Sequence, residues 1–272
     1  MSKLSEHVHR SAINSLRASD GSSSRALESV LRLLAKWRSI LIQNTLVQAS
    51  GTTVQQGLLK GLDFLPHSAE GCHVAKLLGT YEQPLQEPLK ALLLESSYER
   101  VINIGCAEGY YAVGLARILG DALSYAYDTD AKARDACMAL AVKNNIKERV
   151  IVGELFTHSD FAIFSGKKSL VFCDIEGAEK QLLDPALAPE LAELDIVVES
   201  HECLVPGITR LLMERFGKTH NIIKIEDNGM RHLESMPAWF YKLAHLDQLL
   251  CTWEWRSGPT PWLIMRAKRE GK

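Results

Sequence analysis

The sequence lacks the features that mark several large classes of protein. Its 272 residues contain no apolar run of the roughly 18 residues that a membrane-spanning helix needs. Polar, serine-rich residues occupy positions 11–24, where a secretory signal peptide would carry its apolar core. The net charge of −2 and the pI near 6.5 give no excess of basic residues of the kind that nucleic-acid-binding proteins show. We therefore expect no membrane partner, no nucleic-acid partner and a cytoplasmic location.

The cysteines are few and scattered. No two of them stand at the CxxC spacing of a metal knuckle or a redox pair, so the pattern indicates reduced thiols in a cytosolic protein. The six positions are Cys72, Cys106, Cys137, Cys173, Cys203 and Cys251.

The first 75 residues form one compositional unit. Residues 1–24 are polar, which predicts a frayed end. Apolar residues then recur at spacings of three and four from Leu27 to Val47, which predicts a long helix that ends at Gly51. A second, short helix is expected over 54–65. We predict that residues 1–75 are a helical appendage, which either covers the active site, packs on the main domain or forms a contact between copies in a homo-oligomer.

Residues 76–272 alternate between short apolar runs and helical patterns, which is typical of a mostly parallel sheet covered by helices on both faces. We expect an α/β fold with a doubly wound, seven-stranded sheet. The predicted strands are 100–104, 123–127, 149–152, 169–173, 194–198, 221–225 and 262–266, and the predicted helices are 84–94, 110–119, 131–144, 179–183 and 208–216.

The most informative stretch is 101–109, Val-Ile-Asn-Ile-Gly-Cys-Ala-Glu-Gly. A strand pattern ends there in Gly105 and Gly109, and a helical pattern follows from Tyr110. Glycine allows a sharp turn and close approach of a ligand, and the first N–H groups of the helix can bind a carboxylate or a phosphate. The stretch predicts a seat for a small polar cofactor.

An acidic residue follows the second predicted strand. Asp128 is placed to accept hydrogen bonds from both ribose hydroxyls of an adenosine. Asp130 has an alternative role as the N-cap of the helix that begins at Ala131. The turn lacks the middle glycine of the dinucleotide pattern GxGxxG and carries Glu108 instead. A carboxylate there would repel a pyrophosphate but not the cationic methionine end of S-adenosylmethionine, so the charge favours the latter.

The fourth predicted strand ends in Phe172-Cys-Asp-Ile-Glu-Gly-Ala-Glu179. Together with Asn103-Ile-Gly-Cys-Ala-Glu-Gly-Tyr-Tyr111, this run resembles the FkbM-type class I methyltransferases, whose pattern is Asp-x-Gly-Ala-x-x-Gly-Tyr-Tyr followed by Asp-x-Glu-Gly-Ala-Glu. The resemblance covers residues 79–266 and includes Gly79-Thr-Tyr-Glu82. Asn103 stands where the family has an acid, so the amide can hydrogen-bond the cofactor but supplies no charge.

The resemblance implies a Rossmann-like methyltransferase fold that binds S-adenosylmethionine. It places Gly105, Ala107 and Gly109 beside the methionine part and Asp128 at the ribose. Glu154, after the third strand, is a weaker candidate for the adenine region, and an ordinary loop carboxylate is its alternative reading. The full set of expected cofactor-binding residues is Tyr81, Asn103, Gly105, Cys106, Ala107, Gly109, Asp128 and Glu154.

Strands four and five are expected to bring Asp174, Glu199 and His201 to one cleft. His201 can take the proton from an acceptor hydroxyl. Alternatively, the three residues can hold Mg²⁺ or Mn²⁺, which favour carboxylate ligands. A third reading is structural, with the two acids capping loops. Glu176 and Glu179 are expected to stabilise their own turn and helix.

Tryptophans gather near the C-terminal end, within and beside the 227–261 insertion. They are expected to pack the insertion onto the sheet, and an aromatic wall for a flat acceptor is the alternative.

The sequence predicts a methyltransferase that acts on the oxygen of a small-molecule hydroxyl, such as a natural product or a sugar, a preference implied by the resemblance. A nicotinamide-dependent oxidoreductase and a methyltransferase-like binding protein without activity remain alternatives.

Overall fold

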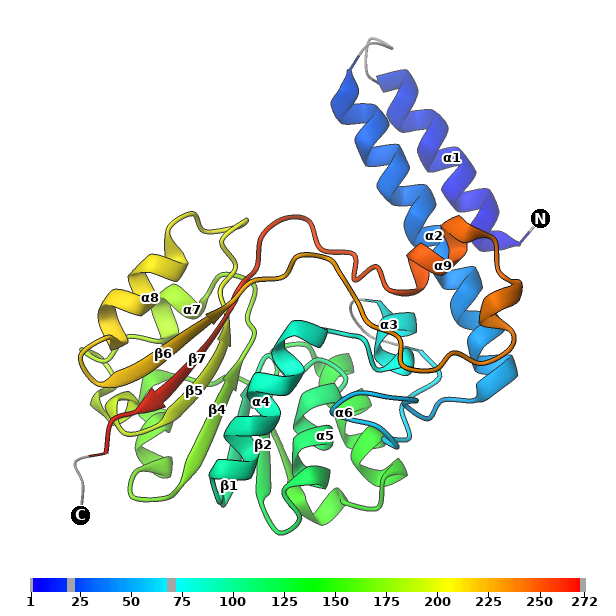
Figure 1. Cartoon of the computed structure of the whole chain (residues 1–272). Helices are drawn as coiled ribbons and strands as arrows, with labels where there is room; N and C mark the ends of the chain where they lie inside the picture. The colour runs from blue at the N-terminus through cyan, green and yellow to red at the C-terminus, as the bar shows by residue number, and fades with distance from the viewer. Residues whose placement is uncertain (1, 19–22, 68–71, 270–272) are drawn as a thin grey trace.

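The computed structural model describes residues 2–18, 23–67 and 72–269. A seven-stranded sheet with the order β3-β2-β1-β4-β5-β7-β6 forms its centre (Figure 1). The first five strands are parallel, and β7 runs antiparallel between β5 and β6. The expected α/β fold with a doubly wound, mostly parallel sheet is therefore confirmed.

The strands lie within one or two residues of their predicted positions because each is a short apolar run bounded by polar or glycine residues. Their bounds are β1 Arg100–Ile104, β2 Leu123–Tyr127, β3 Val150–Gly153, β4 Ser169–Cys173, β5 Asp195–Glu199, β6 His220–Ile225 and β7 Trp262–Ala267.

Helices cover both faces of the sheet, as Figure 1 shows. The α-helices are α1 Lys3–Ala18, α2 Ser24–Ser50, α3 His73–Leu78, α4 Gln83–Glu95, α5 Tyr110–Ile118, α6 Ala131–Lys143, α7 Glu179–Leu182, α8 Ile208–Phe216 and α9 His245–Cys251. Four 3-10 helices, η1 Lys147–Arg149, η2 His158–Phe164, η3 Pro189–Ala192 and η4 Phe240–Lys242, complete the described elements.

Alternation along the central strands separates two apolar layers. Ile102 and Ile104 of β1 pack in the layer that includes residues of η2 and α8, whereas Val101 packs with Leu85 and Leu89 of α4. The side chains of a strand point alternately to the two faces, so both faces of β1 are buried. This rigid double layer fixes where the strand ends, and hence the loops that follow them, lie.

The N-terminal helices differ from expectation at two places. Residues 3–18 form the regular helix α1 rather than a frayed end, because α1 packs along α2 and buries Val8 (Figure 1). Helix α2 ends at Gly51 as predicted, since the Gly51 N–H caps the Val47 carbonyl. None of the described helices is long and apolar enough to cross a membrane.

The predicted helix over 54–65 is wrong. This segment folds back on itself, with a bridge between Thr53 and Asp63, and five of its residues are buried. Gly57 and Gly61 adopt positive φ angles of 74° and 81°, which turn the chain instead of continuing a helix. The apolar spacing is explained by burial of Val54, Leu62 and Phe64 in the core shared with α5 and α6. The division of the chain at residue 75 stays a prediction.

Candidate active site

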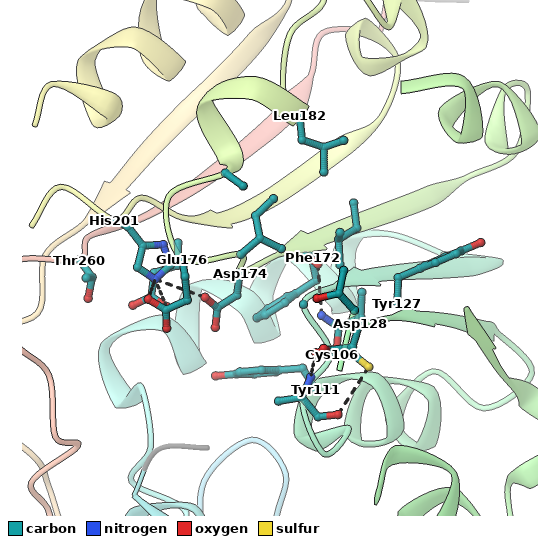
Figure 2. Close-up of a pocket in the computed structure, with 18 of the residues that line it drawn as sticks. Cys106, Tyr111, Tyr127, Asp128, Phe172, Asp174, Glu176, Leu182, His201 and Thr260 are labelled. Atoms are coloured by element: carbon teal, nitrogen blue, oxygen red, sulfur yellow. Dashed lines mark hydrogen bonds and ion pairs between the residues drawn. The ribbon is translucent and has the colours of Figure 1, made fainter. Parts of the chain in front are cut away.

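A cavity of about 810 Å³ opens at the carboxyl ends of β1, β2, β4 and β5. The strand order reverses here, because β2 and β3 lie on one side of β1 whereas β4 and β5 lie on the other. Parallel α/β sheets bind ligands at such a point. Figure 2 shows two groups of side chains in the cavity. Asp128, Tyr127 and Cys106 lie at one end, and His201, Glu176 and Asp174 at the other, with Phe172 between them.

The first end is built by the turn after β1. Gly105 and Gly109 have φ angles of 79° and 89°, so both need glycine's conformational freedom. Their missing side chains make room for the protein itself. A Cβ on Gly105 would overlap the Asp174 carbonyl oxygen, and one on Gly109 would lie 2.7 Å from Cys137 Sγ. Gly105, Cys106 and Ala107 line the cavity, whereas Gly109 is buried and is not part of the lining.

Asp128 is held at the end of β2 by the backbone. Its Oδ2 accepts a hydrogen bond from the Ala107 N–H and its Oδ1 accepts one from the Asp130 N–H, each at 2.9 Å. A carboxylate has about four acceptor positions, so both oxygens can still accept from a ligand. Asp130 instead caps α6 by accepting from the Lys132 N–H, which confirms its alternative role. Asp128 therefore combines a fixed position with acceptor capacity toward the cavity.

Glu108 does not face the cavity. Its side chain is fully buried and forms a 2.5 Å ion pair with Lys76 Nζ of α3. The expected repulsion between Glu108 and a pyrophosphate therefore does not apply, because a buried cation compensates the carboxylate. Lys76 lines the cavity in its place. Sequence reasoning passed over Lys76 because nothing in its local pattern shows a partner 32 residues away.

His201 is the centre of the second end. Its Nδ1 lies 2.8 Å from Glu179 Oε1, while its Nε2 lies 3.5 Å from Asp174 Oδ1 and 3.7 Å from Glu199 Oε2. The structure thus brings the three predicted residues together, and it adds Glu176 at 3.5 Å from Nε2. Glu179 also accepts from the Ile175 N–H, so it fixes both the turn after β4 and the imidazole ring.

The pKa values of His201 and Asp174 at this end are both raised by their surroundings. Burial opposes protonation of His201, but the hydrogen bond to Glu179 and the charge of Glu199 outweigh it and raise the pKa of the imidazole. Burial, followed by the charge of Glu199, raises the pKa of Asp174 well above its usual range. Both residues therefore hold their protons at higher pH than they would in water.

A salt-bridge network closes this end from the side of the β6–β7 insertion. Arg256 contacts Glu199 and lies 3.1 Å from both Glu82 Oε1 and Glu254 Oε2. The Tyr111 hydroxyl donates to Glu82 Oε2 at 2.5 Å. Burial, followed by the charge of Glu199, raises the pKa of Glu82 to about 8. The insertion thus contributes both the cation and Glu254, while Glu82 is the N-cap of α4 and Glu199 ends β5.

The acids at this end are poor ligands for Mg²⁺ as they stand. Among the described residues, two groups have ligand atoms close enough to share an ion, namely Asp174–Glu179–His201 and Glu82–Asp174–Glu199. The predicted trio of Asp174, Glu199 and His201 is divided between them. Arg256 already neutralises Glu82 and Glu199, and Glu179 already accepts from His201. A divalent ion would have to displace these partners, so we assign it no step.

The remaining predicted site residues also line the cavity. Asn103 lines the cavity and donates its amide N–H to the Phe172 carbonyl at 3.3 Å, so it also joins β1 to β4. Tyr81 and Glu154 line the cavity, the latter on an exposed loop after β3. Of the tryptophans, Trp239 donates to the Ser50 hydroxyl and Trp253 lies 5.7 Å from Arg32, so both rings pack toward α2 and not onto the sheet as expected. Trp255 lines the cavity, and the aromatic wall for a flat acceptor stays a prediction.

No protein-family model and no curated protein sequence matches the chain. Solved structures of similar fold do exist. The O-methyltransferase from Bacillus cereus in complex with SAH is 15% identical, with 69% of this chain and 81% of that chain covered and a TM-score of 0.46. The O-methyltransferase TomG from Streptomyces achromogenes, involved in tomaymycin synthesis and in complex with SAM, is 13% identical, with 68% and 81% covered and a TM-score of 0.45. Similarity at this level carries no argument about function, so the function has to be argued from the residues of the site.

Proposed function

We propose that the protein is an S-adenosylmethionine-dependent methyltransferase that methylates a hydroxyl oxygen of a small molecule. One observation carries the proposal. A single cavity is lined by the backbone-held carboxylate of Asp128 at one end and by the hydrogen-bonded imidazole of His201 at the other. Its volume lies in the upper part of the range of small-molecule sites, which suits a donor and an acceptor side by side.

The residues present at the donor end fit the donor. Asp128 would hold the ribose, with Tyr127 and Phe156 beside it in the cavity wall and Glu154 on the loop that would flank the adenine. The turn at Gly105, Cys106 and Ala107 would flank the methionine part. When bound, the donor supplies an electrophilic methyl group, and the sulfur retains the electron pair of the broken bond as a neutral thioether.

The residues of the other end would handle the acceptor's proton. Glu179 accepts from the Nδ1–H of His201, which fixes the tautomer that leaves the Nε2 lone pair toward Asp174 and the cavity. This Nε2 would take the hydroxyl proton as the oxygen forms its bond to the methyl carbon. Glu179 and Glu199 would stabilise the resulting imidazolium at 2.8 and 3.7 Å. Most of the remaining acceleration would come from holding donor and acceptor in line.

The choice of oxygen and the acceptor class rest on the motif resemblance to FkbM-type enzymes, which we propose as the subfamily. Natural products and sugars carry the hydroxyl groups that such a site would methylate. The aromatic side chains of Tyr81, Tyr111 and Trp255 in the cavity wall support an acceptor with an apolar or ring-shaped part.

Calorimetric titration with S-adenosylhomocysteine tests the donor assignment. We expect binding to the parent protein, and at least a tenfold loss, about 1.4 kcal/mol, in Asp128→Ala. Asp130→Ala is the matched control, because it removes a helix cap two residues away and should change stability by about 1 kcal/mol without weakening binding. Equal affinity in the parent and Asp128→Ala would overturn the assignment. Tight binding of NADH in place of S-adenosylhomocysteine would favour an oxidoreductase.

A further inference from the structure

The buried pair of Lys76 and Glu108 adds a second charged feature to the donor end of the cavity. Lys76 comes from α3, before the sheet begins, and Glu108 from the turn after β1. Glu108 is fully buried and lies outside the cavity lining, whereas Lys76 belongs to that lining although only 5% of its side chain is exposed. The pair is thus oriented, with its positive member on the cavity side.

The Lys76 ammonium is buried between aromatic rings and is not an ordinary surface charge. Its Nζ lies 4.9 Å from the ring centre of Tyr81 and 5.7 Å from that of Tyr110, and both rings line the cavity. These rings and Glu108 hold the ammonium in place and keep water away from it. An anionic ligand group that entered here would meet a cation in a medium of low dielectric constant, where charge attraction is stronger than in water.

We propose that Lys76 binds the α-carboxylate of the methyl donor, with Glu108 as the positioning residue behind it. The inference rests on the proposed function, because it concerns the same cavity. Both residues contact the same turn after β1, since Lys76 pairs with Glu108 at 2.5 Å and Asp128 accepts from the Ala107 N–H at 2.9 Å. Lys76 for the carboxylate and Asp128 for the ribose would fix the donor at two points. The site would therefore discriminate between amino-acid-bearing nucleosides and those without the carboxylate.

The test compares two ligands that differ in one group, S-adenosylhomocysteine and its decarboxylated analogue, by calorimetry. The parent should bind the carboxylated ligand at least tenfold more tightly. In Lys76→Met combined with Glu108→Gln, which replaces a neutral pair by a neutral pair of similar size, the preference should fall below threefold. The single variant Lys76→Met removes the ammonium that pairs with the buried Glu108, and its thermal unfolding shows how much of any loss is structural.

The outcomes separate this inference from the proposed function. Tight binding of both ligands by the parent with no preference would overturn the role of Lys76 and leave the methyltransferase assignment standing, and this result needs no variant to fold. A double variant that loses equal affinity for both ligands would make the pair purely structural. Failure of the parent to bind either ligand would overturn the proposed function and this inference with it.

Discussion

The two ends of the cavity are built in different ways. At the donor end, two backbone N–H groups hold the carboxylate of Asp128, one from Ala107 in the positive-φ turn after β1 and one from Asp130 in the loop after β2. At the acceptor end, side chains from α4, β4, β5 and the β6–β7 insertion converge, and nearly all of the contacts are ionic. The contrast indicates that the position of Asp128 depends on backbone shape, whereas the acceptor end depends on a balance of several buried charges.

The contrast predicts first that removal of the histidine damages turnover and not donor binding. His201→Ala should lower kcat by about 10² to 10⁴, because the acceptor proton loses its base, while the affinity for S-adenosylhomocysteine stays within twofold. The exposed His245 serves as the control position, and His245→Ala should leave both quantities unchanged. Turnover of His201→Ala equal to that of the parent would exclude His201 as the base.

We also expect kcat/KM to depend on pH through the protonation of His201. The base must be neutral to accept a proton, and its pKa is raised by Glu179 and Glu199 despite burial. The value of kcat/KM should therefore rise with pH through an apparent pKa above the ordinary histidine value of about 6.5. A profile that is flat between pH 6 and 8 would contradict this account.

A second prediction concerns the charge balance. Arg256→Met leaves Glu82, Glu199 and Glu254 without their shared cation and should lower the free energy of unfolding by about 3 kcal/mol or more. Arg210→Met, which breaks a surface pair with Glu214, should change it by less than about 1 kcal/mol.

The loss in Arg256→Met should be smaller at pH 6 than at pH 8. The folded-state pKa of Glu82 is about 8, which is higher than in an unfolded chain, so the folded state gains stability as the pH falls and this carboxyl takes up its proton. Protonation removes one of the uncompensated charges. Thermal unfolding of the parent, Arg256→Met and Arg210→Met at the two pH values measures this loss. A loss in Arg256→Met that does not depend on pH would show that the Glu82 charge does not contribute to it.

A further prediction concerns the glycine turn at the donor end and the stability of the protein. Gly105→Ala should destabilise the protein by more than about 2 kcal/mol, because the new Cβ overlaps the Asp174 carbonyl and the φ of 79° disfavours alanine. Gly120→Ala has a similar φ of 66° but no atom within 4 Å of the new Cβ, so only the conformational cost of about 1 kcal/mol applies. Equal losses in chemical denaturation would show that packing on β4 is unimportant.

The sequence was sufficient for features whose cause is local. Strands such as β1 and β4 were predicted to the residue, because a short apolar run between turn signals has few alternative structures. The N-cap role of Asp130 also follows from local spacing. The sequence does not predict helix α1, because its polar residues become helical through packing on α2. The helix predicted over 54–65 is wrong because residues buried in the core can recur with a helical spacing.

The charged contacts of the site could not be predicted, because their partners are distant in the sequence. Arg256 and Glu82 are 174 residues apart, and only the fold shows that one neutralises the other. Glu108 illustrates the consequence, since its position beside the glycine turn suggested contact with the cofactor while its actual partner is Lys76. A motif identifies which residue types gather at a strand end, but their charge state depends on neighbours that a motif does not contain.

The most direct test of the account is a crystal structure of the protein with S-adenosylhomocysteine. It should show both ribose hydroxyls within hydrogen-bond distance of the Asp128 carboxylate and the thioether sulfur on the side of the cavity that faces Asp174 and His201. A ligand bound outside this cavity, or one whose sulfur points away from His201, would contradict the central claim that one pocket holds the donor at the glycine turn and directs its methyl group toward the histidine.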